Sequence, residues 1–69
     1  MKKMKAVLNN GYLVYSDDTN ILMELLTSNN EINWHLFNNG EYFYSDNCEE
    51  YLVDGMNDTD NTIVLIKCK

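Results

Sequence analysis

The sequence predicts an α+β domain with a small antiparallel sheet of about five strands and one or two short helices. An internal repeat is the first observation, because residues 8–18 recur as residues 37–47 with six of eleven positions identical. Each copy places Asn-Gly between two apolar runs, which predicts a hairpin because a type I′ turn needs positive φ at both central residues. The last observation is Thr62–Cys68, an apolar and β-branched run that predicts a C-terminal strand.

The first copy of the repeat predicts a hairpin that pairs about Lys3–Leu8 with Tyr12–Ser16. A serine–aspartate pair follows, which is a helix N-cap signal. Asn20–Thr27 is rich in leucine and also holds methionine and glutamate, which favour a helix. An apolar run this short also fits a strand that turns at Asn29-Asn30 and pairs with Glu31–Phe37.

The second copy predicts a hairpin between Ile32–Phe37 and Glu41–Ser45. Asp46 and Glu49 then have the spacing of a capping box, in which the third residue after the cap bonds back to it. The sequence therefore predicts a short helix over Cys48–Asp54, ended by a glycine.

The end of the chain predicts a polar loop over Asn57–Asn61 and the final strand over Thr62–Cys68. All lysines lie near the two termini, in or next to the first and last predicted strands: Lys2, Lys3, Lys5, Lys67 and Lys69. Terminal strands of small sheets often pair, so we expect these lysines to gather at one edge of the sheet. Lysine at an edge also discourages aggregation between sheets.

Length and composition indicate one small globular domain, residues 1–69. The 45% hydrophobic content and the aromatic residues are sufficient for a packed core. Met1–Lys5 is basic, but the apolar run after it is too short for a secretory signal. With two cysteines and no long apolar stretch, the sequence predicts a cytoplasmic protein with reduced thiols.

Charge is the strongest functional signal in the sequence. The formal net charge is −6, and between Ala6 and Ile66 the chain contains every acidic residue but neither lysine nor arginine. Eleven asparagines indicate an AT-rich gene, and such a gene should also supply lysine. A net negative charge disfavours direct binding to nucleic acid or to an anionic membrane, and it favours a basic partner.

The carboxylates are candidates for an array that imitates the phosphates of DNA. Acids two apart on a strand are separated by about 6.6–6.8 Å, which approximates the regular charge spacing of a nucleic-acid backbone. Carboxylates at helix starts are also locally favourable, so capping explains part of the pattern. The predicted array consists of Asp17, Asp18, Glu31, Glu41, Asp46, Glu49, Glu50, Asp54, Asp58 and Asp60.

In size, acidity and lack of basic residues the chain resembles the small phage-encoded DNA-mimic inhibitors. The resemblance covers the whole chain and includes its asparagine-rich composition, but it rests on no motif. It implies a non-enzymatic inhibitor in the host cytoplasm, without cofactor or metal. Its partner would be a basic DNA-binding protein of the host, such as a nucleoid protein, a glycosylase or a defence nuclease.

The aromatic residues support an alternative function. Tyr42 and Tyr44 share one face of a predicted strand, and exposed tyrosine and tryptophan are typical interface anchors. With Trp34 they would form the binding face of a protein-binding adaptor or anti-defence factor, whose acids serve solubility only. Both faces of the sheet are partly apolar, so a homodimer through the sheet is compatible with either function.

Catalytic residues are not indicated. His35 is a single histidine in a predicted strand, and Cys48 has acids rather than basic residues near it in sequence. Residues 54–60 offer several oxygen ligands but lack the glycine and closing glutamate positions of a calcium loop. The sequence therefore predicts neither an enzyme nor a metal site.

Overall fold

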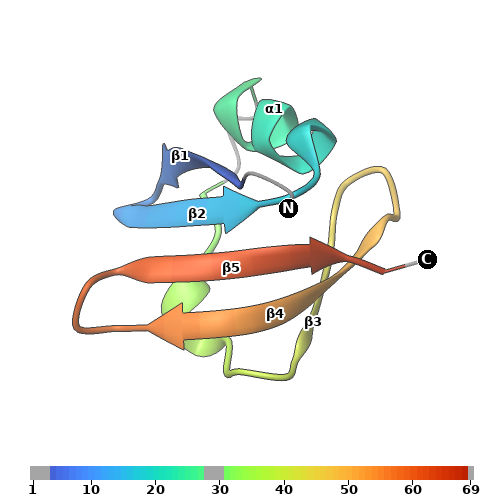
Figure 1. Ribbon diagram of the computed structural model, residues 1–69. Coiled ribbons are helices and arrows are strands. Elements are labelled where there is room, and N and C mark those ends of the chain that lie inside the picture. The colour runs from blue at the N-terminus through green and yellow to red at the C-terminus, as the bar shows by residue number, and fades with distance from the viewer. Residues whose placement is uncertain (1–3, 28–30, 69) are drawn as a thin grey trace.

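The computed structural model describes residues 4–27 and 31–68, which form one α-helix, one 3-10 helix and a five-stranded sheet (Figure 1). In chain order the elements are β1 (Lys5–Asn9), β2 (Tyr12–Ser16), α1 (Thr19–Thr27), η1 (Trp34–Leu36), β3 (Tyr42–Tyr44), β4 (Glu50–Asn57) and β5 (Thr62–Lys67). The strand order across the sheet is β1-β2-β5-β4-β3. The α+β class and the strand number are as predicted. The sheet is mixed rather than purely antiparallel, because β2 and β5 run parallel.

The first predicted hairpin is confirmed. β1 and β2 pair antiparallel with Val7 opposite Val14, and Asn10 and Gly11 form the turn between them. Asn10 has φ 47° and Gly11 has φ 83°, the positive values that a two-residue hairpin turn requires. The local sequence is therefore sufficient to specify this hairpin.

The second predicted hairpin is wrong, although its turn forms. The Glu41 N–H donates to the Asn38 carbonyl and Gly40 has φ 89°. The segment before this turn contains the 3-10 helix η1 instead of a strand, so the turn leads from η1 into β3. The reason is Trp34, which is 0% exposed and donates its indole Nε1–H to the Asn9 side chain at 3.0 Å. Burying this side chain against β1 removes the segment from the sheet.

The predicted helix over Cys48–Asp54 is also wrong, because most of this segment belongs to β4. The capping signals close a turn instead. The Ser45 hydroxyl accepts from the Glu49 N–H, and Cys48 has φ 63°, a left-handed conformation that does not continue into a helix. From Glu50 onward the side chains alternate between the two faces of the sheet, and Tyr51 and Val53 enter the core.

The helix α1, the polar turn before β5 and the strand β5 confirm the predictions for those segments. The expectation that the terminal strands pair is wrong, because β2 lies between β1 and β5. Lys5 therefore lies on an edge strand and Lys67 on the central strand. Lys2, Lys3 and Lys69, which belong to the same expectation, lie outside the described residues.

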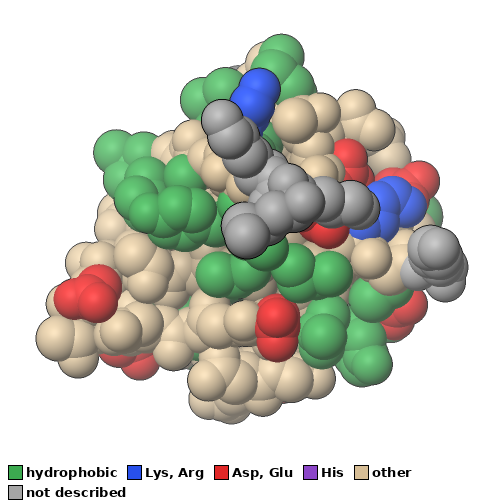
Figure 2. Space-filling view, in the orientation of Figure 1, with side chains coloured by type: hydrophobic (Ala, Val, Ile, Leu, Met, Phe, Trp, Pro, Cys, Tyr) green, Lys and Arg blue, Asp and Glu red, His purple; other side chains and the backbone are tan. Residues whose placement is uncertain are grey.

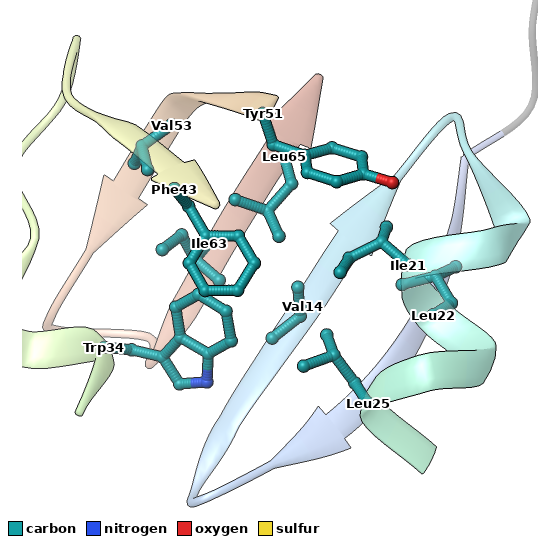
Figure 3. Close-up of a cluster of buried hydrophobic side chains, with 10 residues drawn as sticks. All are labelled: Val14, Ile21, Leu22, Leu25, Trp34, Phe43, Tyr51, Val53, Ile63 and Leu65. Carbon is teal, nitrogen blue, oxygen red and sulfur yellow. The ribbon is translucent and has the colours of Figure 1, made fainter. Parts of the chain in front are cut away.

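The hydrophobic core lies on one face of the sheet (Figure 3). Ile21, Leu22 and Leu25 of α1 pack near Val14, while Trp34 and Phe43 lie on the other side of that valine. Trp34 and Phe43 have their ring centroids 5.2 Å apart, and Phe37 and Tyr51 also contact Phe43. In Figure 1, η1 lies behind β5 and β4, so the covering segments share this face.

Candidate partner-binding surfaces

The fold collects carboxylates at one end of the sheet. β2 and β5 finish at this end, because they run parallel, and β4 begins there, because it is antiparallel to β5. We call this region the acidic end and define it by the six carboxylates of Asp17, Asp18, Glu24, Asp46, Glu49 and Glu50. They come from three segments: the β2–α1 connection, α1 itself, and the β3–β4 connection with the first residue of β4.

Asp18 is held by two hydrogen bonds. Its Oδ1 accepts from the Asn20 N–H at 3.0 Å, as expected of an N-cap carboxylate. Its Oδ2 accepts from the Tyr51 hydroxyl at 2.7 Å, which ties the start of α1 to β4. Burial, followed by this hydrogen bond, raises the pKa of Tyr51 well above its ordinary value.

Glu24 connects α1 with the turn after β3. Its Oε2 accepts from the Asp46 N–H at 3.1 Å, and its Oε1 accepts from the Asn47 side-chain amide at 3.3 Å. The two bonds fix the distance between the helix and the turn. The sequence prediction omitted Glu24, because its partners Asp46 and Asn47 are more than twenty residues away in the sequence.

A groove of about 480 Å³ lies between α1 and the β3–β4 connection. Asp18, Glu24 and Glu49 line it, together with Tyr51 and Lys67. The Lys67 ammonium forms a salt bridge with Glu49, and the hydrogen bond to that carboxylate raises the pKa of Lys67. The groove therefore has negative walls and one lysine that is already paired.

The other predicted carboxylates lie away from the acidic end. Asp58 and Asp60 are in the β4–β5 turn at the opposite end of the sheet. Glu31 is also there, because the neighbouring Ile32 carbonyl accepts from Asn10 in the β1–β2 turn. Glu41 and Asp54 lie between the two ends, along β3 and β4. The predicted ten-residue array is thus divided, with five of its members at the acidic end.

A second surface is the face of the sheet opposite the core. We call it the open face and define it by outward-pointing apolar and tyrosine side chains. Cross-strand register places Ala6, Tyr15 and Val64 in one row, and Ile66, Leu52 and Tyr42 in another. Figure 2 views this side of the molecule, where hydrophobic side chains gather over β2, β5 and β4. The members are Leu8, Leu13, Tyr15, Tyr42, Tyr44, Leu52, Val64 and Ile66.

The predicted interface aromatics divide between the two faces. Tyr42 is 52% exposed and Tyr44 63% exposed, both on the open face. The Tyr44 hydroxyl donates to Glu50 Oε2 at 2.9 Å, which raises the pKa of Tyr44. Trp34 lies in the core, so the expectation that it forms part of an exposed binding face is wrong. Its need for a buried hydrogen-bond partner was met by Asn9, which the sequence did not reveal.

The residues with potential chemistry are dispersed. Cys48 and Cys68 are free thiols, and His35 is exposed on η1. The described residues hold no group of three His, Cys, Asp or Glu side chains arranged to bind a metal ion. Between residues 4 and 68, apart from 28–30, no helix is both long and apolar enough to cross a membrane.

Comparisons with protein-family models, curated proteins and solved structures find no match for this chain. The acidic end and the open face are therefore the features on which a function can be argued.

Proposed function

We propose that this chain is a non-enzymatic binding protein whose acidic end occupies the DNA-binding surface of a basic protein. The observation that carries the proposal is the meeting of six carboxylates from three separate segments at one end of the sheet, where Asp18, Glu24 and Glu49 line a groove. The described lysines at this end are Lys5, opposite Ser16 in the β1–β2 pair, and Lys67, which is paired with Glu49. Negative charge thus outweighs positive charge at this end.

The hydrogen bonds within the acidic end support the proposal. Asp18, Glu24 and Glu50 are each held by donors of the protein itself. A carboxylate that is already fixed loses less conformational entropy when a partner binds. It also remains a hydrogen-bond acceptor for arginine or lysine, because a carboxylate offers about four lone-pair positions. The groove can therefore present charges at fixed positions, as a phosphate backbone does.

The net charge of the whole chain supports the same conclusion. A field of one sign accelerates association with an oppositely charged partner, and this acceleration falls as salt screens the field. Binding that replaces DNA on a basic surface should therefore weaken strongly with ionic strength.

The test uses DNA-binding proteins of a bacterial lysate, loaded on immobilised duplex DNA. Addition of the full chain should release one or more of them, and release should fall steeply between about 50 and 200 mM salt. The variant Asp46→Asn/Glu49→Gln/Glu50→Gln should lose most of this activity, because it neutralises half of the acidic end. The control Asp54→Asn/Asp58→Asn/Asp60→Asn changes the net charge equally and should retain most of it. Salt-insensitive release, or equal losses in the two variants, would contradict the proposal.

A second candidate function is an adaptor that binds a protein through the open face, with its acids serving solubility. The exposure of Tyr42 and Tyr44 favours it. The variant Tyr42→Ser distinguishes the two candidates, because it leaves the hydrogen bond from Tyr44 to Glu50 in place. An adaptor would lose its partner, whereas a DNA mimic would keep its activity in the release assay.

A further inference from the structure

We propose that the open face is the interface of a homodimer, in which a second copy of this chain packs sheet against sheet. This surface meets the acidic end at Glu50, which faces Tyr44, but it consists of apolar and tyrosine side chains, so the inference does not depend on the proposed function. In the part of the chain that the structure describes, α1 and η1 lie on the core side, and the open face has neither element packed on it.

The side chains of the open face favour its burial against another surface. Val64 and Ile66 point outward from β5, the central strand, with Leu13, Tyr15 and Leu52 beside them. These side chains are partly exposed, and none of them carries a charge. A surface of this kind gains most by packing against another apolar surface.

The positions of the lysines and carboxylates are compatible with this dimer. Register places Lys5 opposite Ser16 and Lys67 opposite Tyr51, so both lysines extend from the core side of the sheet. Glu50 and Asp54 of β4 lie on the open face, Glu50 opposite Tyr44 and Asp54 at the bulge of β4 beside Val64. A two-fold axis along β5 would set β4 of one copy against β2 of the other. Glu50 and Asp54 would then face β2 of the other copy and avoid their own counterparts.

The small size of the domain also favours association with a second copy. A 69-residue domain buries only about 60% of its unfolded surface and is marginally stable alone, so a second copy adds stability by mass action. Five strands about 4.8 Å apart, with about five residues each, cover roughly 20 by 17 Å. Two such faces with their side chains would bury roughly 1,000 Å² or more, at the lower end of specific interfaces. We therefore expect a reversible dimer with a Kd on the order of 10 µM.

Salt distinguishes this interface from binding at the acidic end. Two copies of net charge −6 repel each other, and salt screens that repulsion. Dimerisation should therefore strengthen with ionic strength, whereas binding of a basic partner should weaken.

The test is sedimentation equilibrium of the full chain over a concentration range from about 1 to 200 µM, on both sides of the expected Kd. The wild type should dimerise, and its Kd should fall several-fold between about 50 and 300 mM NaCl. Val64→Lys places a charge at the centre of the face and should leave a monomer throughout. Tyr44→Lys, at a position 63% exposed, should raise the Kd at least about tenfold with little risk to folding.

The control is Leu36→Lys, which makes the same kind of change at a leucine 67% exposed on η1. It should leave the Kd unchanged, and circular dichroism should show native secondary structure for all variants. A wild type that stays monomeric at the highest concentration and salt would overturn the proposal. So would equal weakening by Leu36→Lys and Tyr44→Lys, or tighter dimers at low salt. None of these outcomes bears on release of proteins from DNA, so the two proposals can fail separately.

Discussion

The acidic end and the open face are built in opposite ways. At the acidic end, carboxylates from separate segments are fixed by hydrogen bonds, such as those from Tyr51 to Asp18 and from the Asp46 N–H to Glu24. On the open face, apolar side chains are aligned only by the alternation of neighbouring strands. Individual polar contacts therefore fix the positions of the side chains at the acidic end, whereas strand register fixes them on the open face. The two surfaces should accordingly respond to salt with opposite signs.

The largest expected effect comes from comparing a side chain on the core face of the sheet with one on the open face. Trp34→Ala should cost about 3–5 kcal/mol, because it removes a fully buried indole and leaves a cavity. That is comparable with the whole stability of a domain this small, at roughly 0.05–0.15 kcal/mol per residue. Tyr44→Ala on the open face should change the free energy of unfolding by only about 0.5 kcal/mol.

Urea unfolding followed by circular dichroism measures both variants, at a protein concentration of about 1 µM so that the monomer predominates. Equal costs for the two substitutions would show that the open face is covered in the monomer, and would break the comparison.

The second effect concerns the carboxylates of the acidic end. Asp18→Ala should cost about 2 kcal/mol, because it removes an N-cap and the acceptor of the Tyr51 hydroxyl. Asp58→Ala makes the same charge change but removes one exposed hydrogen bond from Tyr12, so about 0.5 kcal/mol is expected. Urea midpoints give both values. If Asp58→Ala costs as much, the carboxylates of the acidic end are not specially fixed.

The third effect concerns alkaline pH. The folded state raises the pKa of Tyr51 above its ordinary value of 10.0, so the unfolded chain loses this proton first. Above about pH 10 the folded state binds more protons than the unfolded state, and the free energy of unfolding must fall as pH rises. Below that pH the contribution is fully present.

Tyr51→Phe should cost about 1 kcal/mol at pH 7 and make the alkaline loss of stability shallower. Some loss should remain, because hydrogen bonds to carboxylates also raise the pKa of Tyr12, Tyr44 and Lys67. Urea unfolding at a series of pH values up to 11 measures the slope. An unchanged slope in Tyr51→Phe would mean that this hydroxyl is accessible to solvent.

The smallest expected effect is that of salt on the monomer. Increasing NaCl from about 0.05 to 0.5 M should stabilise the fold by a few tenths of a kcal/mol, because it screens repulsion among carboxylates. The variant Asp46→Asn/Glu49→Gln/Glu50→Gln should respond less than the wild type. Destabilisation by salt would show instead that ion pairs such as Lys67–Glu49 outweigh the repulsion.

Sequence patterns predicted the structure correctly where the residues of one segment alone determine it. Asn10-Gly11 specifies the first hairpin because the turn geometry itself needs those residues. The same signal at Asn39-Gly40 produced a turn but no hairpin, because burial of Trp34 drew the preceding segment into the core. The capping signals before Glu49 likewise closed a turn, because β4 was needed between β3 and β5.

The candidate surfaces were predicted in part for the same reason. Five of the six carboxylates of the acidic end, and Tyr42 and Tyr44 of the open face, were identified from strand alternation and helix-start signals. Glu24 was missed, because its contacts are with Asp46 and Asn47, which lie more than twenty residues away. Contacts between distant segments leave no periodic signal in the sequence.

The sequence by itself determined the charge of this protein, the absence of lysine and arginine between Ala6 and Ile66, and the alternation that gives the sheet two partly apolar faces. The tertiary structure alone decided which carboxylates meet and which face is covered. It did so by pairing β5 parallel to β2, which brings the ends of both strands to the same end of the sheet. Pairing between distant strands depends on the packing of the whole core, so no single segment encodes it.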